Sequence, residues 1–359
     1  MKIIHTGDLH LGSALRNFPI EKAKLRQREM MDTFADLARY AKGNDVAAVL
    51  IAGDLFDGNF VSQQWITEVY SIIQNASPVA FFYVKGNHDD GVKIGKGLPE
   101  NLHLFSQNGW TRYDLSESVT VSGMDMQYLD EGKYRDLCLA KEKFNVLLLH
   151  GEIVGNGTEK GRIALSRLSG KNVDYLALGH IHKPTLRSER LDARGKYRYC
   201  GCLESRGFDE CGDRGFFLLE IENGQLRSER FLSLAKRNVF EIRADISGCE
   251  TYFDVERTVL ETMKNITTQN AVKTVLCGRH KAGLKKDLAL LSDRLNSRWF
   301  FVKVEDETKL FLDVESFRND LSEQGEFVRE VGRYALNEEL RMEILDIGLK
   351  ALAGEEIDL

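Results

Sequence analysis

The segment Asp174–Pro184, DYLALGHIHKP, joins a short apolar run to a glycine and to two histidines one residue apart. The run YLAL has the length and composition of a buried strand. In an extended segment, residues i and i+2 point to the same side, so His180 and His182 can face one site together. The chain has only eight histidines in 359 residues, so such a pair directly after a strand indicates a functional site.

Four other apolar runs in the first half of the chain share this arrangement. Each has the pattern of a buried strand, and each is followed at once by side chains that can bind a metal. The runs and the side chains that follow them are Lys2–Thr6 with Asp8 and His10, Val46–Ala52 with Asp54 and Asp57, Val79–Val84 with Asn87 and His88, and Phe144–Leu149 with His150. Ligands of α/β sheets bind at the carboxyl ends of the strands. The five strand ends together predict a metal site assembled from loops.

Helical patterns separate several of these strands and indicate the fold class. The segment Glu21–Asn44 has helix-forming composition, and Ser62–Gln74 also has a helical pattern. Strands that alternate with helices predict an α/β layered fold. Between Tyr197 and Leu232, shorter strand-like pieces separated by glycines predict an antiparallel section that completes the first domain.

The chain is predicted to divide into three parts, at residues 1–235, 236–312 and 313–359. In the second part, three strand-like segments alternate with two helical patterns, the second of which presents Leu284, Leu288, Leu291 and Leu295 on one face. This order predicts a small α/β accessory domain. The third part is acidic and helical, with Phe327, Val331 and Ala335, and then Leu340, Ile344, Ile347 and Ala351, at helical spacing. These apolar faces fit either packing on their own domain or binding of a partner.

Composition favours a globular protein of the cytoplasm. The chain is 43% hydrophobic and 29% charged. Its apolar runs are far shorter than the about 18 residues that span a bilayer, and the start MKIIHTGDLH lacks the apolar core of a signal peptide. The six cysteines fit a reducing compartment. Cys200, Cys202 and Cys211 lack the C-x₂-C spacing of zinc sites, so free thiols are the favoured interpretation over a metal or redox role.

The net charge of −6 is unevenly distributed. From Glu305 onward, sixteen acidic residues outnumber six basic ones, whereas residues 1–304 carry 43 basic and 39 acidic groups. A weakly positive body with an acidic tail is compatible with a polyanionic substrate and a separate partner. Basic residues gather in two segments that suit contact with a phosphate backbone, solvated loops being the alternative. They are Lys183, Arg187, Arg190, Arg194, Lys196 and Arg198 in the first segment, and Arg279, His280, Lys281, Lys285 and Lys286 in the second.

Taken in order, D-x-H, G-D-x-x-D, G-N-H-D, a single H and G-H-x-H resemble the motif series of the calcineurin-like metallophosphoesterases, over about residues 1–182. Within that superfamily the chain is similar to the SbcD-type DNA repair nucleases, the bacterial counterparts of the eukaryotic double-strand-break nuclease. The narrower resemblance rests on HTGDLHLG, on YCGCLESRGFDE and on the small α/β domain. It implies a four-layer α-β-β-α sandwich with a small second α/β domain and a helical C-terminus. The chain departs from the pattern at Tyr199–Cys202, often Tyr-Pro-Gly-Ser in such nucleases, and at Asp57, which is His in several relatives.

The resemblance also implies a site for two divalent ions, with Mn²⁺ favoured and Fe or Zn as alternatives. Asp8, His10 and His182 would hold the first ion and Asn87, His150 and His180 the second, with Asp54 bridging both. Two such ions can clamp the attacking and leaving oxygens of a phosphoryl displacement, in which a bridging hydroxide is the implied nucleophile.

The family pattern makes His88 a catalytic residue rather than a ligand. It would act as general acid to the leaving oxygen or as a stabiliser of charge on the phosphoryl group. Asp57 or Asp89 would orient it, although ordinary turn carboxylates are the alternative. Three basic residues are predicted to contact the substrate: Lys183, Arg187 and Arg206.

These features together predict a metal-dependent DNA nuclease, as exonuclease or endonuclease, that acts in DNA repair. The resemblance further implies an SbcC-like ATPase bound through the C-terminal region, and a homodimer. One alternative is a related phosphoesterase for a nucleotide, cyclic nucleotide or phosphoprotein, although GDLFDGN lacks the arginine of the protein phosphatase motif G-D-x-V-D-R-G. A non-catalytic scaffold is the other alternative, and the complete ligand set argues against it.

Overall fold

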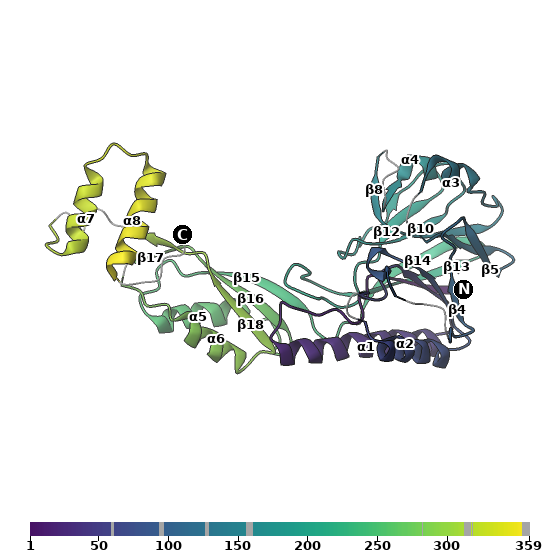
Figure 1. The fold of residues 1–359 in the computed structure, drawn as a ribbon, viewed down its shortest axis with the longest axis horizontal. Coiled ribbons are helices and arrows are strands. Elements are labelled where there is room, and N and C mark those ends of the chain that lie inside the picture. The colour runs from purple at the N-terminus through teal and green to yellow at the C-terminus, as the bar shows by residue number, and fades with distance from the viewer. Residues whose placement is uncertain are drawn as a thin grey trace. The chain divides into compact units, whose positions relative to one another are not determined.

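The computed structural model describes residues 1–58, 61–92, 97–125, 129–155, 161–281, 283–311, 317 and 319–353. The chain forms two compact units, Met1–Val239 and Phe240–Leu359 (Figure 1). The division into domains 1–235, 236–312 and 313–359 stays a prediction, and its second boundary lies outside the described residues. No helix in the described ranges is long and apolar enough to cross a membrane.

The first unit contains two six-stranded sheets. One has the order β14-β13-β1-β2-β3-β4, in which β1 to β4 are parallel and β13 and β14 are antiparallel. Its strands are β1 (Lys2–Thr6), β2 (Val46–Ala52), β3 (Ala80–Val84), β4 (Leu102–Leu104), β13 (Gly215–Glu222) and β14 (Gln225–Ser233). The connections β1–β2 and β2–β3 contain α1 (Ile20–Gly43) and α2 (Gln63–Asn75), which lie along one face of this sheet in Figure 1.

The second sheet has the order β11-β12-β10-β7-β6-β5, with a parallel centre and antiparallel edges. Its strands are β5 (Thr111–Ser116), β6 (Val119–Gly123), β7 (Phe144–His150), β10 (Tyr175–Gly179), β11 (Glu189–Arg190) and β12 (Lys196–Tyr199). Two short helices, α3 (Glu131–Asp136) and α4 (Leu165–Leu168), cover its outer face through Tyr134 and Leu168. Short β8 (Glu152–Val154) and β9 (Arg162–Ala164) pair with each other.

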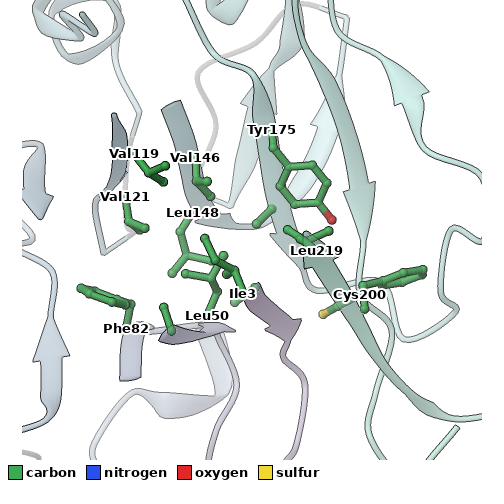
Figure 2. Close-up of a cluster of buried hydrophobic side chains, with 14 of the residues drawn as sticks. Ile3, Leu50, Phe82, Val119, Val121, Val146, Leu148, Tyr175, Cys200 and Leu219 are labelled. Carbon is green, nitrogen blue, oxygen red and sulfur yellow. The ribbon is translucent and has the colours of Figure 1, made fainter. Parts of the chain in front are cut away.

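The two sheets pack face to face through an apolar layer, shown in Figure 2. Ile3, Leu50 and Phe82 come from the first sheet, and Val146 and Leu148 from the second. With a helical layer outside each sheet, the predicted α-β-β-α sandwich is confirmed. Of the five predicted strands, three are in one sheet and two in the other, so the ends that carry the polar side chains come from both sheets.

The second unit contains a three-stranded sheet covered by two helices (Figure 1). Its elements are β15 (Val239–Asp245), α5 (Tyr252–Met263), β16 (Ala271–Cys277), β17 (Arg279–Lys281), α6 (Leu288–Asn296), β18 (Phe301–Asp306) and β19 (Lys309–Phe311). The helix predicted to contain Leu284 is shorter than expected, because the Asp287 side chain caps α6 at its N-terminus. Leu284 is buried in the preceding loop.

Two helices form the last described part of the chain. The helices α7 (Glu323–Gly332) and α8 (Glu338–Ala353) pack on each other through Val328, Val331, Leu345 and Leu349. The predicted helical pattern through Ala335 is wrong at its end, because α7 stops at Gly332. Part of each predicted apolar face is therefore covered by the other helix.

Candidate metal centre

The loops after β1 and β2 run side by side and carry three of the predicted ligands. The Asp8 N–H donates to the Gly53 carbonyl at 3.0 Å, and the His10 N–H donates to the Asp54 carbonyl at 2.9 Å. Parallel pairing thus continues beyond the two strands. It holds Asp8 and His10 next to Asp54.

Backbone strain is concentrated at these turns. Asp8, His10, Asp54 and His180 have φ angles of 51°, 45°, 48° and 100°, in the left-handed region that non-glycine residues rarely adopt. Gly53 has φ of +89°, and a Cβ there would lie 2.1 Å from Nδ1 of His150. The glycine before Asp54 therefore allows both the turn and the close approach of His150. Such strain is kept only where the surrounding structure enforces it, and it clusters at functional sites.

Three further hydrogen bonds join the remaining strand ends to this pair of loops. The His88 N–H donates to Oδ1 of Asp54 at 2.8 Å. The His180 N–H lies 2.9 Å from both carboxylate oxygens of Asp8. Nδ1 of His150 lies 2.9 Å from the Ala52 carbonyl. All five strand ends are therefore linked at one place.

The predicted ligands of the first ion lie together. Nε2 of His10 is 3.2 Å from Nε2 of His182 and 3.7 Å from Oδ2 of Asp54. Asp8, His10 and His182 each offer a ligand atom within 4.8 Å of the other two.

The predicted ligands of the second ion form an adjoining cluster. Nε2 of His150 is 3.0 Å from Oδ1 of Asn87 and 3.4 Å from Oδ2 of Asp54. Nδ1 of His180 lies 3.2 Å from the same Asn87 oxygen. Asp54 Oδ2 thus lies near nitrogen atoms of both clusters. Their roles as ligands remain a proposal.

The chemistry of this donor set fits cations. The Ala52 carbonyl can only accept, so the His150 proton lies on Nδ1 and the Nε2 lone pair faces the oxygens of Asn87 and Asp54. Lone pairs that face one another repel, and a cation between them is bound by both. Nitrogen and oxygen donors without thiolate suit Mn, Fe or Zn.

The pKa values agree with that interpretation. Burial, together with the charge of Asp54, raises the pKa of Asp8 well above its ordinary value. Burial lowers the pKa of His10 well below its ordinary value and that of His150 to about 4. The imidazoles are therefore neutral, as ligands must be, and the buried carboxylates lack positive charge.

His182 is held by a residue to which the sequence interpretation gave no role. Nδ1 of His182 lies 2.6 Å from Oε1 of Glu210. Burial raises the pKa of Glu210, but the hydrogen bond to His182 and the charge of Arg206 outweigh it and lower that pKa to about 2. Glu210 ends the stretch YCGCLESRGFDE, and nothing in the spacing indicated that it reaches back to His182.

Arg206 was predicted to contact the substrate. Its guanidinium donates to Oε1 of Glu210, and Nη2 lies 2.9 Å from Nδ1 of His182. Its described contacts are therefore within the centre. They fit a role in positioning the carboxylate.

His88 is at the solvent side of the centre, with 45% of its side chain exposed. Its ring meets that of His10 edge-on at 4.8 Å, and its Nδ1 is 3.9 Å from Oδ1 of Asp57. Asp89 is buried and accepts hydrogen bonds from the Phe56 and Gly86 N–H groups, both at 2.9 Å. Of the two predicted orienting residues, Asp57 faces His88, whereas Asp89 joins the loops after β2 and β3.

The predicted basic segments are more heavily paired than their sequence indicated. Arg194 binds Asp174, and Lys196 and Arg198 bind Glu229, with Arg198 fully buried. In the second unit, His280 is buried, and Lys281 and Lys286 pair with Glu250 and Asp306, respectively. Lys183 and Arg187 are exposed, and no ion pair of theirs occurs among the described residues.

The cysteines near the centre are free thiols. Cys200 and Cys202 are buried, and burial raises the pKa of both thiols well above the ordinary value. Cys211 is exposed. The two buried thiols are thus protonated and act as packing groups.

Known proteins resemble this part of the chain. A family profile described as calcineurin-like phosphoesterase matches residues 1–184. An uncharacterised metallophosphoesterase, YhaO, of Bacillus subtilis is 26% identical over 250 residues, which cover 64% of this chain and 59% of the relative. The DNA double-strand break repair protein Mre11 of Methanopyrus kandleri is 24% identical over 65% of this chain and 57% of its own length. The chain thus spans less than two thirds of these two relatives. For a subunit of the nuclease SbcCD from Staphylococcus epidermidis, 24% identical, the shares are 67% and 72%.

Solved structures with a related fold were also found. The structure of TT1561 from Thermus thermophilus covers 64% of this chain and 98% of its own, with 14% identity and a TM-score of 0.44. A nuclease from Pseudomonas putida, MPE, covers 62% of this chain and 85% of its own, with 13% identity and a TM-score of 0.28.

Proposed function

This chain belongs to the calcineurin-like phosphoesterase family, and we propose that it is a two-metal-dependent phosphodiesterase that cleaves DNA. One observation carries the proposal: side chains from five strand ends form two adjoining clusters of ligand atoms around Asp54.

The residues that would hold the ions are those of the two clusters. Asp8, His10 and His182 form one set and Asn87, His150 and His180 the other, with Asp54 common to both. Two bound divalent ions would polarise the phosphoryl group and promote deprotonation of water. The donor set itself carries two negative charges, because Asn87 and the imidazoles are neutral. The loaded site therefore keeps a net positive charge that attracts a phosphodiester.

His88 is proposed to assist departure of the leaving oxygen. Its exposed ring can reach a substrate that approaches from solvent, and Asp57 faces its Nδ1. The Nδ1 proton then points toward a carboxylate, which leaves Nε2 to donate a proton to the leaving oxygen or to stabilise its charge.

Three observations support DNA as the substrate. Relatives of the chain are named as a double-strand break repair protein and as nuclease subunits. The centre is open to solvent at His88, as a polymer requires. Lys183 and Arg187 follow the ligand His182 and are exposed, so they can bind phosphates on either side of the cleaved bond. An SbcC-like ATPase bound through residues 313–359, a homodimer, Mn²⁺ as the ion and a cytoplasmic location stay predictions.

The experiment compares cleavage of linear double-stranded DNA by the wild type and by His88→Ala, in Mn²⁺ and with a chelator control. Wild type is expected to degrade DNA only with metal, and His88→Ala to lose about 100-fold or more in rate while it still binds metal. His103→Ala serves as the control, because His103 is on β4, where it stacks on Phe82.

Two results would count against this function. Normal cleavage by His88→Ala would refute the role of His88, as would loss of metal from that variant. An aryl phosphodiester is offered in the same assay. Its hydrolysis with DNA left intact would keep the metal centre but replace the nuclease by a phosphoesterase for small substrates.

A further inference from the structure

We propose that Glu210, supported by Arg206, is a positioning residue for the first metal ion: it fixes the proton of His182 on Nδ1 and turns Nε2 toward that ion. The inference rests on the proposed two-metal site. It concerns one half of that site.

The hydrogen bond between the two side chains determines the tautomer. Oε1 of Glu210 lies 2.6 Å from Nδ1 of His182, and Glu210 is only 4% exposed. An ionised carboxylate can only accept, so the imidazole proton lies on Nδ1. Nε2 then carries a lone pair, and it lies 3.2 Å from Nε2 of His10 within the first cluster.

Glu210 is itself held at both carboxylate oxygens. Oε2 accepts the Arg206 N–H at 2.7 Å and lies 3.5 Å from Sγ of Cys202. Oε1 accepts from Nη2 and Nε of Arg206, at 3.0 and 3.2 Å. The carboxylate therefore has one orientation, and it transmits that orientation to the His182 ring.

The backbone of His182 is fixed by the same segment. Its carbonyl accepts from the Cys202 N–H at 3.1 Å and from Nη1 of Arg214 at 2.8 Å. Nε of Arg214, a buried residue, lies 3.2 Å from the Glu210 carbonyl. Residues 202–214 thus grip His182 at the ring and at the main chain.

The second cluster has other supports. His150 is held by the Ala52 carbonyl, and the rings of His150 and His180 both contact Asn87. A change at Glu210 is therefore expected to affect one ion of the two. Loss of a carboxylate behind a ligating histidine typically lowers metal affinity by about 10–100-fold.

The test uses the full chain and Mn²⁺ alone, with calorimetric titration and electron paramagnetic resonance to count the ions. Glu210→Gln keeps the size of the side chain and an oxygen acceptor. It is expected to weaken one of two ions by about 10–100-fold and leave the other unchanged. The neighbouring exposed Asp209→Asn removes the same charge and is expected to behave as wild type.

A second readout needs no metal. Nitrogen-15 NMR of the metal-free protein above pH 7 distinguishes the two imidazole tautomers. His182 is expected as the Nδ1–H form in wild type and as a mixture in Glu210→Gln. If Glu210→Gln does not fold, Arg206→Gln replaces it, and it is expected to weaken the same ion by a smaller factor.

Two results would overturn the inference: wild-type affinity for both ions together with an unchanged tautomer, or equal weakening of both ions. Failure of the parent proposal would look different. A wild type that binds two ions but leaves DNA intact would refute the nuclease and leave this role of Glu210 standing. A wild type that cannot bind two ions would overturn both.

Discussion

The five strands that build the centre have two contrasting environments along their length. Their middle residues, such as Ile3, Leu50 and Leu148, are fully buried in an apolar layer between the sheets. Just beyond their carboxyl ends, Asp8 and Asp54 are as deeply buried, but as charged groups on strained backbone. The apolar layer supplies the stability that keeps the strained loops in place. Changes at the strand ends should therefore remove metal binding, whereas changes in the middle should remove stability.

The largest effect is expected from Gly53→Ala at the strand ends. The new Cβ would lie 2.1 Å from Nδ1 of His150 at a φ of +89°, so His150 or the Asp54 turn must move. We expect affinity for Mn²⁺ to fall by more than the about 100-fold typical of a change behind a ligand. Isothermal titration measures it.

Gly170→Ala separates this clash from backbone strain alone. Gly170 has φ of +74°, but nothing lies within 4 Å of a Cβ built there. This variant should lose some stability and bind metal normally. If both variants bind Mn²⁺ equally well, the close packing of Gly53 against His150 does not matter for the centre.

Leu148→Ala tests the opposite end of the comparison. Leu148 on β7 is fully buried between the sheets, so its truncation leaves a cavity and is expected to cost about 2–5 kcal/mol in the free energy of unfolding. Urea denaturation measures this loss, with Leu186→Ala, 65% exposed, as the control. Below its unfolding transition the variant should still bind two ions. Loss of one ion in folded Leu148→Ala would show that core and centre are not separable.

A smaller, pH-dependent effect is expected from His5, a histidine of β1 within the apolar layer. Its ring nitrogens contact the Tyr175 hydroxyl and the Leu178 carbonyl. Burial, and then the charge of Arg198, lower the pKa of His5 to about 3, from 6.5 in the unfolded chain. Between these values the unfolded state binds more protons, so the stability that neutral His5 contributes is complete above pH 6.5 and is lost as the pH falls.

Between pH 7.5 and pH 5.0 this difference amounts to about 2 kcal/mol, at about 1.4 kcal/mol for each pH unit below 6.5. Urea denaturation of wild type and His5→Gln in chelator at both pH values measures it. The wild type should lose more stability than the variant on acidification. Equal losses would mean that His5 is charged in the folded protein, or that its burial has no energetic consequence.

Sequence patterns predicted the strands well because each is a continuous apolar run. The bounds Lys2–Thr6 and Val46–Ala52 are those of β1 and β2. The order of polar residues after the runs also predicted which side chains meet, because carboxyl ends of parallel strands share an edge. Contacts made by irregular loops gave no such signal. Glu210 reaches His182 only through the conformation of residues 202–214.

Charge in the sequence was a weaker guide. Arg198 belongs to the basic segment predicted to bind DNA, yet it is buried with its guanidinium 4.0 Å from the Phe217 ring centre. Its position on β12 directs it between the sheets, and this direction depends on strand register rather than on composition. Of that segment, Lys183 and Arg187 are the residues retained in the proposal.

The most direct test of the central claim is to locate Mn²⁺ by anomalous diffraction from crystals grown with the metal. Two peaks are expected, one among Asp8, His10 and His182 and one among Asn87, His150 and His180, with Asp54 next to both. A single peak enclosed by His10, Asp57 and His88, which also offer ligand atoms within 4.8 Å of one another, would contradict the account. His88 would then be a ligand, and the two-metal site with a separate catalytic histidine would be wrong.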